Sequence, residues 1–405
     1  MFRTAQPPSL KSVLVASGII LSLAMGVRHG FGFWLQPISQ QHGWTRETFS
    51  LAMALQNLMW GVFGPFSGMA ADRYGAARVV FFGALLYMAG LLWMAMVDNA
   101  SAFALGSGIL IGAGLACTAF GALSGIVGRT APFAQRSWAF GVLGAAGSFG
   151  QFAMIPIEQQ LIAGAGWQGA LYILAALVVL LMMPLAFMLR EPEVAQHGHG
   201  QQQSVADAVR EAFSYRSFQL LVAGYFVCGF QVVFIGVHLP AYLKDQGILD
   251  PQVAVIALAT IGLFNIVGSF FAGQLGGRLP KPWLLSAIYV IRALFIAIFV
   301  FSPLSTTSVY IFSAAMGLIW LSTVPLTNGL IAGIFGVRHL SMLAGFVFFS
   351  HQLGSFIGVW LGGYLYTVEG SYHTVWMITI ALGVIAGLLN LPIREAPIVR
   401  GQVAA

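Results

Sequence analysis

The chain has 405 residues, of which 59% are hydrophobic and only 7% carry a charge, and its mean hydropathy is +0.86. Soluble domains carry about 25% charged residues, so this composition excludes a water-exposed globular protein and predicts a chain embedded in a bilayer. The net charge of +6 is spread too thinly to form a nucleic-acid-binding surface.

Apolar runs long enough to cross a bilayer recur along the whole chain, and they predict twelve membrane-spanning helices. The first run lacks a cleavage site, so we expect a retained span and not a removed signal peptide. The predicted spans are 13–38, 47–71, 78–97, 101–128, 137–162, 168–189, 217–243, 253–276, 282–302, 306–333, 340–366 and 372–392. The predicted fold is therefore an all-α membrane protein with two pseudo-symmetric six-helix bundles.

The longest polar stretch, 190–216, separates the first six predicted spans from the last six. Its Gln, His and charged residues predict a solvated linker between an N-terminal bundle, 1–189, and a C-terminal bundle, 217–405. His197 and His199 lie in this linker and are expected to be solvated, not metal ligands. Cys117 and Cys228 lie in apolar runs and indicate no disulfide or metal site, and we expect no cofactor.

The Lys and Arg residues of the loops concentrate on one side of the membrane if both termini are cytoplasmic. Arg46 and Lys244 are the basic residues predicted on the other side, and Arg28 and Arg292 lie inside spans. By the positive-inside rule, this bias predicts a multi-pass protein of a bacterial inner membrane with both termini in the cytoplasm.

The two halves show weak self-similarity. When Pro37 is set on Pro240, Gly26 falls on Gly229 and Arg28 falls on Gln231. Internal repeats of this kind in a membrane protein indicate a transporter whose substrate site lies between the repeats.

The loop after the second span, Gly68-Met-Ala-Ala-Asp72-Arg73-Tyr-Gly75-Ala-Ala-Arg78, resembles the G-x-x-x-D-R-x-G-x-x-R loop of the major facilitator superfamily. The resemblance implies a monomeric carrier that works by alternating access, with these five residues forming a conformational gating loop. Gly68 permits close helix contact, and Asp72 can cap or pair locally. The arginines anchor the loop at the cytoplasmic face.

Within the superfamily, the stretches 28–61, 226–243 and 350–363 look like those of bacterial relatives of the monocarboxylate and oxalate/formate carriers. This narrower resemblance implies a small carboxylate as the substrate.

Two arginines lie inside spans, whereas the acids fall in loops or at span ends, with Glu158 near the outer end of the fifth span. A buried cation without a partner is unfavourable, so Arg28 and Arg292 predict a small anionic substrate, which guanidinium binds through two parallel hydrogen bonds. The alternative is that Arg28 and Arg292 only brace helices through carbonyls or neutral side chains such as Gln56, Asn57, Asn265 or Tyr289.

Further polar side chains interrupt the predicted spans and are candidates for contacts in the same cavity. His351 and His238 titrate near neutrality, so either is a candidate carrier of a coupling proton where no acid is available, although a lone histidine also serves as a structural hydrogen-bonding group. The candidate substrate-binding residues besides Arg28 and Arg292 are Gln231, His238, Asn265, His351, Gln352, Gln56, Asn57 and Gln151.

The sequence thus predicts a secondary transporter that moves a small organic anion, of the monocarboxylate class, together with a proton. Its partners are the substrate, protons and the lipid bilayer. One alternative is a proton-coupled exporter of drugs or hydrophobic metabolites, which would be expected to show an embedded carboxylate. An intramembrane enzyme and a channel are disfavoured, because no G-x-S-x-G, H-E-x-x-H or selectivity-filter motif occurs.

Overall fold

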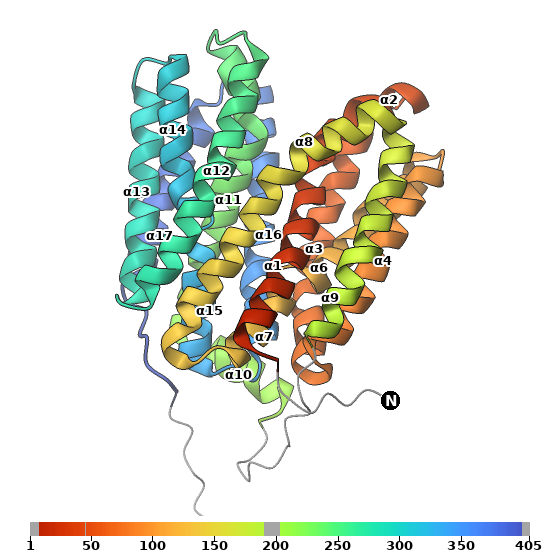
Figure 1. Cartoon of the computed structure of the whole chain (residues 1–405). Helices are drawn as coiled ribbons and strands as arrows, with labels where there is room; N and C mark the ends of the chain where they lie inside the picture. Colours follow the sequence, from red (N-terminus) through yellow and green to blue (C-terminus); the bar gives the residue numbers. More distant parts are fainter. Residues whose placement is uncertain (1–7, 45, 190–202, 399–405) are drawn as a thin grey trace, which may run out of the picture.

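A computed structural model of the chain describes residues 8–44, 46–189 and 203–398, and these residues form helices and connecting turns without a β-strand. Most of the predicted linker, 190–202, with His197 and His199, lies outside the described residues. Figure 1 shows the described helices as two upright groups, one for each half of the chain.

The N-terminal half contains four long helices and several short ones. Three of its predicted spans are interrupted by turns of other helix types, which are labelled η. The elements are α1 (Leu10–His29), η1 (Gly30–Trp34), α2 (Leu35–His42), α3 (Arg46–Tyr74), α4 (Ala76–Met96), α5 (Ala100–Ala104), η2 (Leu105–Leu110), α6 (Ile111–Thr118), α7 (Phe120–Thr130), η3 (Phe133–Gln135), α8 (Arg136–Leu177), η4 (Val178–Met182) and α9 (Met183–Met188).

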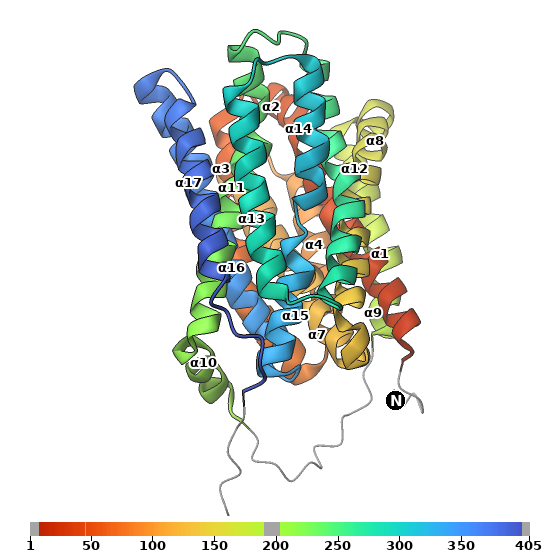
Figure 2. The ribbon, with the colours of Figure 1, turned by 90° about the vertical axis from the view of Figure 1, so that its left-hand side faces the viewer.

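The C-terminal half repeats this arrangement with fewer interruptions, and Figure 2 shows α14 and α15 stacked end to end in it. Its elements are α10 (Val205–Ser214), α11 (Arg216–Asp245), α12 (Pro251–Gly276), α13 (Lys281–Phe301), α14 (Thr306–Ile319), α15 (Thr323–Phe335), α16 (Leu340–Glu369) and α17 (His373–Asn390).

The helices confirm the predicted all-α membrane fold. By length and composition, the described residues give 10 segments able to cross a membrane. One of them, Phe133–Met188, covers both predicted spans 137–162 and 168–189, which bend apart at Gly166, where φ is 70°. Helix α3 covers the predicted span 47–71 but is not among the 10 segments.

One element departs from the predicted linker. Residues 205–214 form α10, an amphipathic helix whose N-cap Ser204 accepts a hydrogen bond from the backbone N–H of Asp207 at 3.1 Å. Ala208 and Ala212 are buried on its inner face. A Ser cap followed by apolar residues at helical spacing favours such a helix, so this part of the linker is ordered against the bundles.

The end of the molecule that carries α10 and the first turns of α1 and α16 is called here the linker end, and the opposite end is called the open end (Figure 1). At the linker end, α3 of the N-terminal half packs closely on α16 of the C-terminal half. A Cβ at Gly345 would lie 2.6 Å from the backbone oxygen of Gly64, and a Cβ at Gly68 would overlap the backbone oxygen of Ser341. Small residues therefore allow these two helices to close this end.

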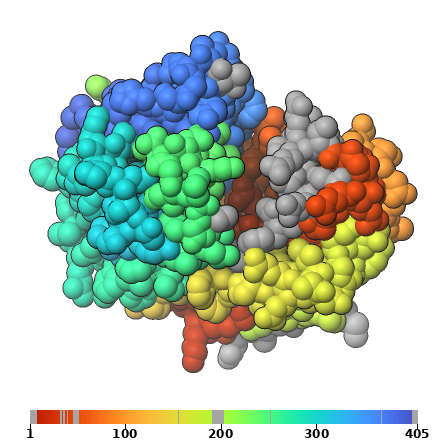
Figure 3. Space-filling model, turned by 90° about the horizontal axis from the view of Figure 1, so that it is seen from above, coloured from red at the N-terminus to blue at the C-terminus, as the bar shows by residue number. Residues whose placement is uncertain are grey.

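Seen from the open end, the molecule is hollowed between the green-to-blue C-terminal half and the red-to-yellow N-terminal half (Figure 3). The two halves thus meet along α3 and α16 toward the linker end and separate toward the open end.

Candidate substrate-binding site

Arg28 lies at the last turn of α1, directly before the chain changes to the 3₁₀ turn η1. Its Nη2 donates a hydrogen bond to Oδ1 of Asn57, and its Cζ lies 4.9 Å from the centre of the Trp60 ring. Asn57 is oriented by a 3.0 Å bond from its Nδ2 to the backbone oxygen of Met53. Within the described residues, Nε of Arg28 has no partner and no carboxylate pairs with the guanidinium.

The facing wall comes from α16 in the other half of the chain. Gln352 donates from Nε2 to the backbone oxygen of Asn57 at 3.0 Å, so the residue that holds Arg28 also joins the two halves. His351 lies 3.2 Å from Oε1 of Gln352, and its ring stacks on that of Phe348 with centroids 5.5 Å apart. Four predicted site residues, Arg28, Asn57, His351 and Gln352, are therefore brought together.

Arg292 has a different environment. It is completely buried, and its Nη2 donates to the backbone oxygens of Ile319 and Trp320 at 2.6 and 2.9 Å. Its Nη1 donates to Oε1 of Gln231 at 3.3 Å. The carbonyls belong to the break between α14 and α15, so Arg292 makes the contacts of a brace, the alternative that the sequence left open for it.

Asn265 completes that brace from the other side. Its Oδ1 accepts a 2.9 Å hydrogen bond from the backbone N–H of Leu321, inside the same break. Its Nδ2 donates to Oγ of Ser148 on α8 at 2.7 Å. Helix breaks leave backbone groups without partners, which is costly in a membrane, and Arg292 and Asn265 supply those partners here.

The remaining predicted residues are used within one half of the chain. His238 bonds the backbone oxygen of Val359 at 2.9 Å and the hydroxyl of Tyr372 at 3.3 Å. Gln231 also donates to the backbone oxygen of Thr379 at 2.9 Å.

Two further candidates lie in the N-terminal half. Gln56 donates to the backbone oxygen of Ser107 at 2.8 Å, inside the π-helical turn η2. Gln151 is buried, and its Nε2 has no partner among the described residues. Only Gln151 of these two keeps a free polar group for a ligand.

The predicted gating loop lies at the linker end, where Asp72 reaches the other half of the chain. It accepts hydrogen bonds from the backbone N–H groups of Met342 and Ser341 at 2.9 and 3.3 Å, and from Nη1 of Arg129 at 2.8 Å. The sequence predicted a local cap or pair, and the observed cap is instead on α16. A carboxylate at a helix N-terminus is favourable, because the backbone N–H groups point toward it.

The other loop residues differ in exposure and role. Gly75 has φ of 86° and makes the turn between α3 and α4, a conformation that disfavours side chains. Arg73 and Arg78 are exposed, and Cζ of Arg73 lies 5.2 Å from the ring centre of Tyr74. Their role as anchors of the loop stays a prediction.

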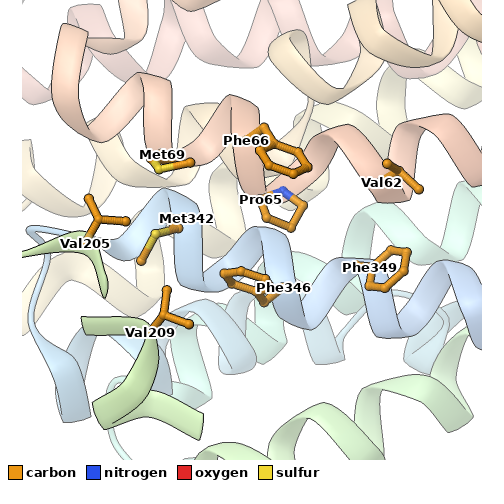
Figure 4. Close-up of a pocket in the computed structure, with 9 residues that line it drawn as sticks. All are labelled: Val62, Pro65, Phe66, Met69, Val205, Val209, Met342, Phe346 and Phe349. Carbon is orange, nitrogen blue, oxygen red and sulfur yellow. The ribbon is translucent and has the colours of Figure 1, made fainter. Parts of the chain in front are cut away.

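A separate cavity of about 280 Å³ lies at the linker end, between α3, α16 and α10. Figure 4 shows apolar side chains around it, namely Val62, Pro65, Phe66, Met69, Val205, Val209, Met342, Phe346 and Phe349. Because it offers no polar group to an anion, it does not form the site for a charged substrate.

Sequence reasoning missed Trp60, which faces Arg28, and Tyr225, whose ring centre lies 5.2 Å from that of His351. It also gave no role to Glu158, which the structure buries completely beside Trp34. The available signal was that Glu158 is an acid inside a predicted span, and such acids are rarely without a function.

Two helical bundles that meet around a polar site, closed at one end and hollow at the other, define a multi-pass membrane transporter. The chain belongs to the Major Facilitator Superfamily, whose family model matches residues 16–332 and 224–402. The protein is accordingly a transporter and not an enzyme.

Its relatives agree with this assignment. The chain is 27% identical over 389 residues to monocarboxylate transporter 13 of Rattus norvegicus. The alignment covers 92% of this chain and 86% of the relative. It is 23% identical over 378 residues to an oxalate:formate antiporter of Oxalobacter formigenes. That alignment covers 92% of this chain and 88% of the antiporter. The fold matches the E. coli fucose:proton symporter FucP with a TM-score of 0.73 at 16% identity, over 93% of this chain and 97% of that chain.

Proposed function

We propose that this protein is a secondary active transporter that moves a small organic anion of the monocarboxylate class across a bacterial inner membrane, together with a proton. The observation that carries the proposal is the environment of Arg28. The residue is partly exposed, and its guanidinium has only neutral partners among the described residues.

A cation inside a membrane protein without an anionic partner is unfavourable, and an anion that binds and leaves compensates it. Guanidinium fits a carboxylate through two parallel N–H···O bonds and keeps its charge at any working pH. Arg28 has a buried Nε without a described partner, so it retains a donor for such a ligand. This supports a carboxylate in preference to a sugar or an organic cation.

The relatives support the same substrate class, since the names of two of them refer to monocarboxylates, oxalate and formate. The positive-inside bias supports a cytoplasmic location for the linker end. A membrane potential opposes entry of an uncompensated anion by about 2.3 kcal/mol per charge per 100 mV, so a proton that travels with the anion removes this cost.

The mechanism is alternating access, in which the N-terminal bundle, 1–189, and the C-terminal bundle, 217–405, rock around the site. With the linker end closed by α3 and α16, the anion enters from the open end and binds Arg28. Gln352 donates a hydrogen bond to the backbone of Asn57 across the two halves, and Asn57 also accepts from Arg28. A ligand bound to Arg28 therefore acts on a residue that joins the two halves.

The experiment is a thermal-shift screen of the purified protein against mono- and dicarboxylates, sugars and cationic dyes. We expect stabilisation by carboxylates alone. In Arg28→Gln the carboxylate affinity should fall about 10- to 150-fold, the value of one charge-assisted hydrogen bond of about 1.5–3 kcal/mol. The matched control is Arg278→Gln, an exposed arginine at the linker end, which should bind normally.

Stabilisation by dyes, and not by carboxylates, would contradict the proposal and favour the exporter. An unchanged carboxylate response in Arg28→Gln would reduce Arg28 to a helix brace.

A further inference from the structure

Helices α1 and α8 pack along a seam in which every fourth residue of one helix meets every fourth residue of the other. Gly150 lies against Ser22, Met154 against Gly26, and Glu158 against Gly30. A Cβ at Gly30 would overlap the carboxyl group of Glu158. The spacing of four residues keeps these positions on one helix face, so Glu158 points into the seam where α1 ends and η1 begins.

The carboxyl group of Glu158 is 0% exposed. Its Oε2 accepts a 3.1 Å hydrogen bond from Nε1 of Trp34, and its Oε1 has no partner among the described residues. Burial of a negative charge with one neutral donor costs far more than burial of a neutral acid. The surroundings therefore hold Glu158 as the uncharged carboxylic acid.

The charged and titratable neighbours of Glu158 come from α1 and α4. Arg28 lies two residues before Gly30, and Tyr87 on α4 is within electrostatic reach of both Arg28 and Glu158. His29, next to Arg28, is held by a bond from its ring to a backbone oxygen of α1. Among these, only Arg28 offers a permanent positive charge that an ionised Glu158 would attract.

We propose that Glu158 is the proton-binding group of this transporter and that it competes with the substrate for Arg28. When Glu158 takes up a proton, its carboxylate becomes a neutral acid and Arg28 is free to bind the anion. When the proton leaves, the carboxylate attracts Arg28, which lies two residues before the contact at Gly30, and displaces the anion. One proton and one monovalent anion then move together without net charge. This inference rests on the proposed function and assigns the proton to Glu158 instead of His351 or His238.

The first arm of the test requires no substrate. Infrared spectra of the protein in lipid nanodiscs are recorded from mildly acidic to alkaline pH. We expect a carboxylic-acid C=O band that disappears as the pH rises in the wild type and in the control Asp98→Asn, an exposed acid at the open end. The band should be missing in Glu158→Gln. A band that persists in Glu158→Gln, or one that does not titrate, overturns the inference.

The second arm measures binding of pyruvate and oxalate by thermal shift over the same pH range. In the wild type the affinity should fall up to about tenfold per pH unit above the titration of Glu158. Glu158→Gln mimics the protonated acid, so its affinity should not depend on pH and should exceed that of the wild type at alkaline pH. A Glu158→Gln variant that follows the slope of the wild type overturns the inference and returns the proton to a histidine.

Proteoliposome uptake separates this inference from the proposed function. In a one-to-one symport, a gradient of about one pH unit supports about tenfold accumulation of pyruvate, because the two free energies are equal. If the wild type and Glu158→Gln accumulate pyruvate equally, the role of Glu158 is wrong and the proposed function stands. If the wild type accumulates neither probe while the infrared band titrates, the carboxylate assignment fails and Glu158 remains a proton-binding group.

Discussion

Replacement of Asp72 by Asn should open the linker end. The Asp72 carboxylate caps α16 through the N–H groups of Met342 and Ser341 and pairs with Arg129, with 3% of its side chain exposed. Charge-assisted bonds are worth about 1.5–3 kcal/mol each, and a charge at a helix end adds up to about 2 kcal/mol. Asn keeps one acceptor and loses the charge, so we expect a shift of about 2–4 kcal/mol toward the open form.

A shift of that size changes the ratio of closed to open linker ends by about 30- to 1000-fold. The assay is a distance measurement between spin labels at Tyr74 and Arg338, two exposed residues of opposite halves at this end. The labels are placed in a background in which Cys117 and Cys228 are replaced. In Asp72→Asn the long-distance population should become dominant.

The matched control is Asp98→Asn, the same change at an exposed acid of the open end. It should leave the distance distribution as in the wild type. If Asp72→Asn also leaves the labels at the short distance, the cap on α16 does not hold the linker end closed, and the close helix packing between the two halves is sufficient to do so.

Two further predictions concern the packing that positions the site. Gly150→Ala should lower the melting temperature by an amount equivalent to about 1–3 kcal/mol, because the new Cβ would overlap the backbone oxygen of Ser22. The control is Gly236→Ala, where a Cβ meets nothing within 4 Å, and this variant should melt at the temperature of the wild type. Arg292→Gln should destabilise the protein by about 1–3 kcal/mol, since the carbonyl of Trp320 loses its donor. Carboxylate stabilisation measured by thermal shift should persist, and its loss would make Arg292 a substrate ligand.

The positions of the long helices could be predicted from the sequence because apolar length alone determines them. The predicted span 340–366 corresponds to Leu340–Glu369, and 282–302 corresponds to Lys281–Phe301. Helix α10 was missed because it is amphipathic and too short to cross a membrane, so a search for long apolar runs does not detect it. The turn η1, Gly30–Trp34, was missed for a different reason, because it lies inside an apolar run and hydropathy does not distinguish helix types.

The candidate site could be predicted only in part, because hydropathy identifies a buried charge but not its partners. Arg28 and Arg292 look alike in the sequence, yet one is partly exposed beside Asn57 and the other is enclosed by backbone carbonyls. The difference arises from the break between α14 and α15, because this break leaves carbonyl groups available to Arg292. No residue pattern in the sequence predicts the break.

The repeat clarifies why the two arginines diverge. It sets Arg28 on Gln231, and Gln231 accepts a hydrogen bond from Arg292 at 3.3 Å. Each half therefore carries a guanidinium close to the same position of its first helix, supplied by α1 in one half and by α13 in the other. In the C-terminal half two backbone oxygens of the break, at Ile319 and Trp320, accept from Nη2 of Arg292, although its Nε has no partner among the described residues. In the N-terminal half the described contacts leave the charge of Arg28 incompletely satisfied, and only an incompletely satisfied cation can bind and release an anion.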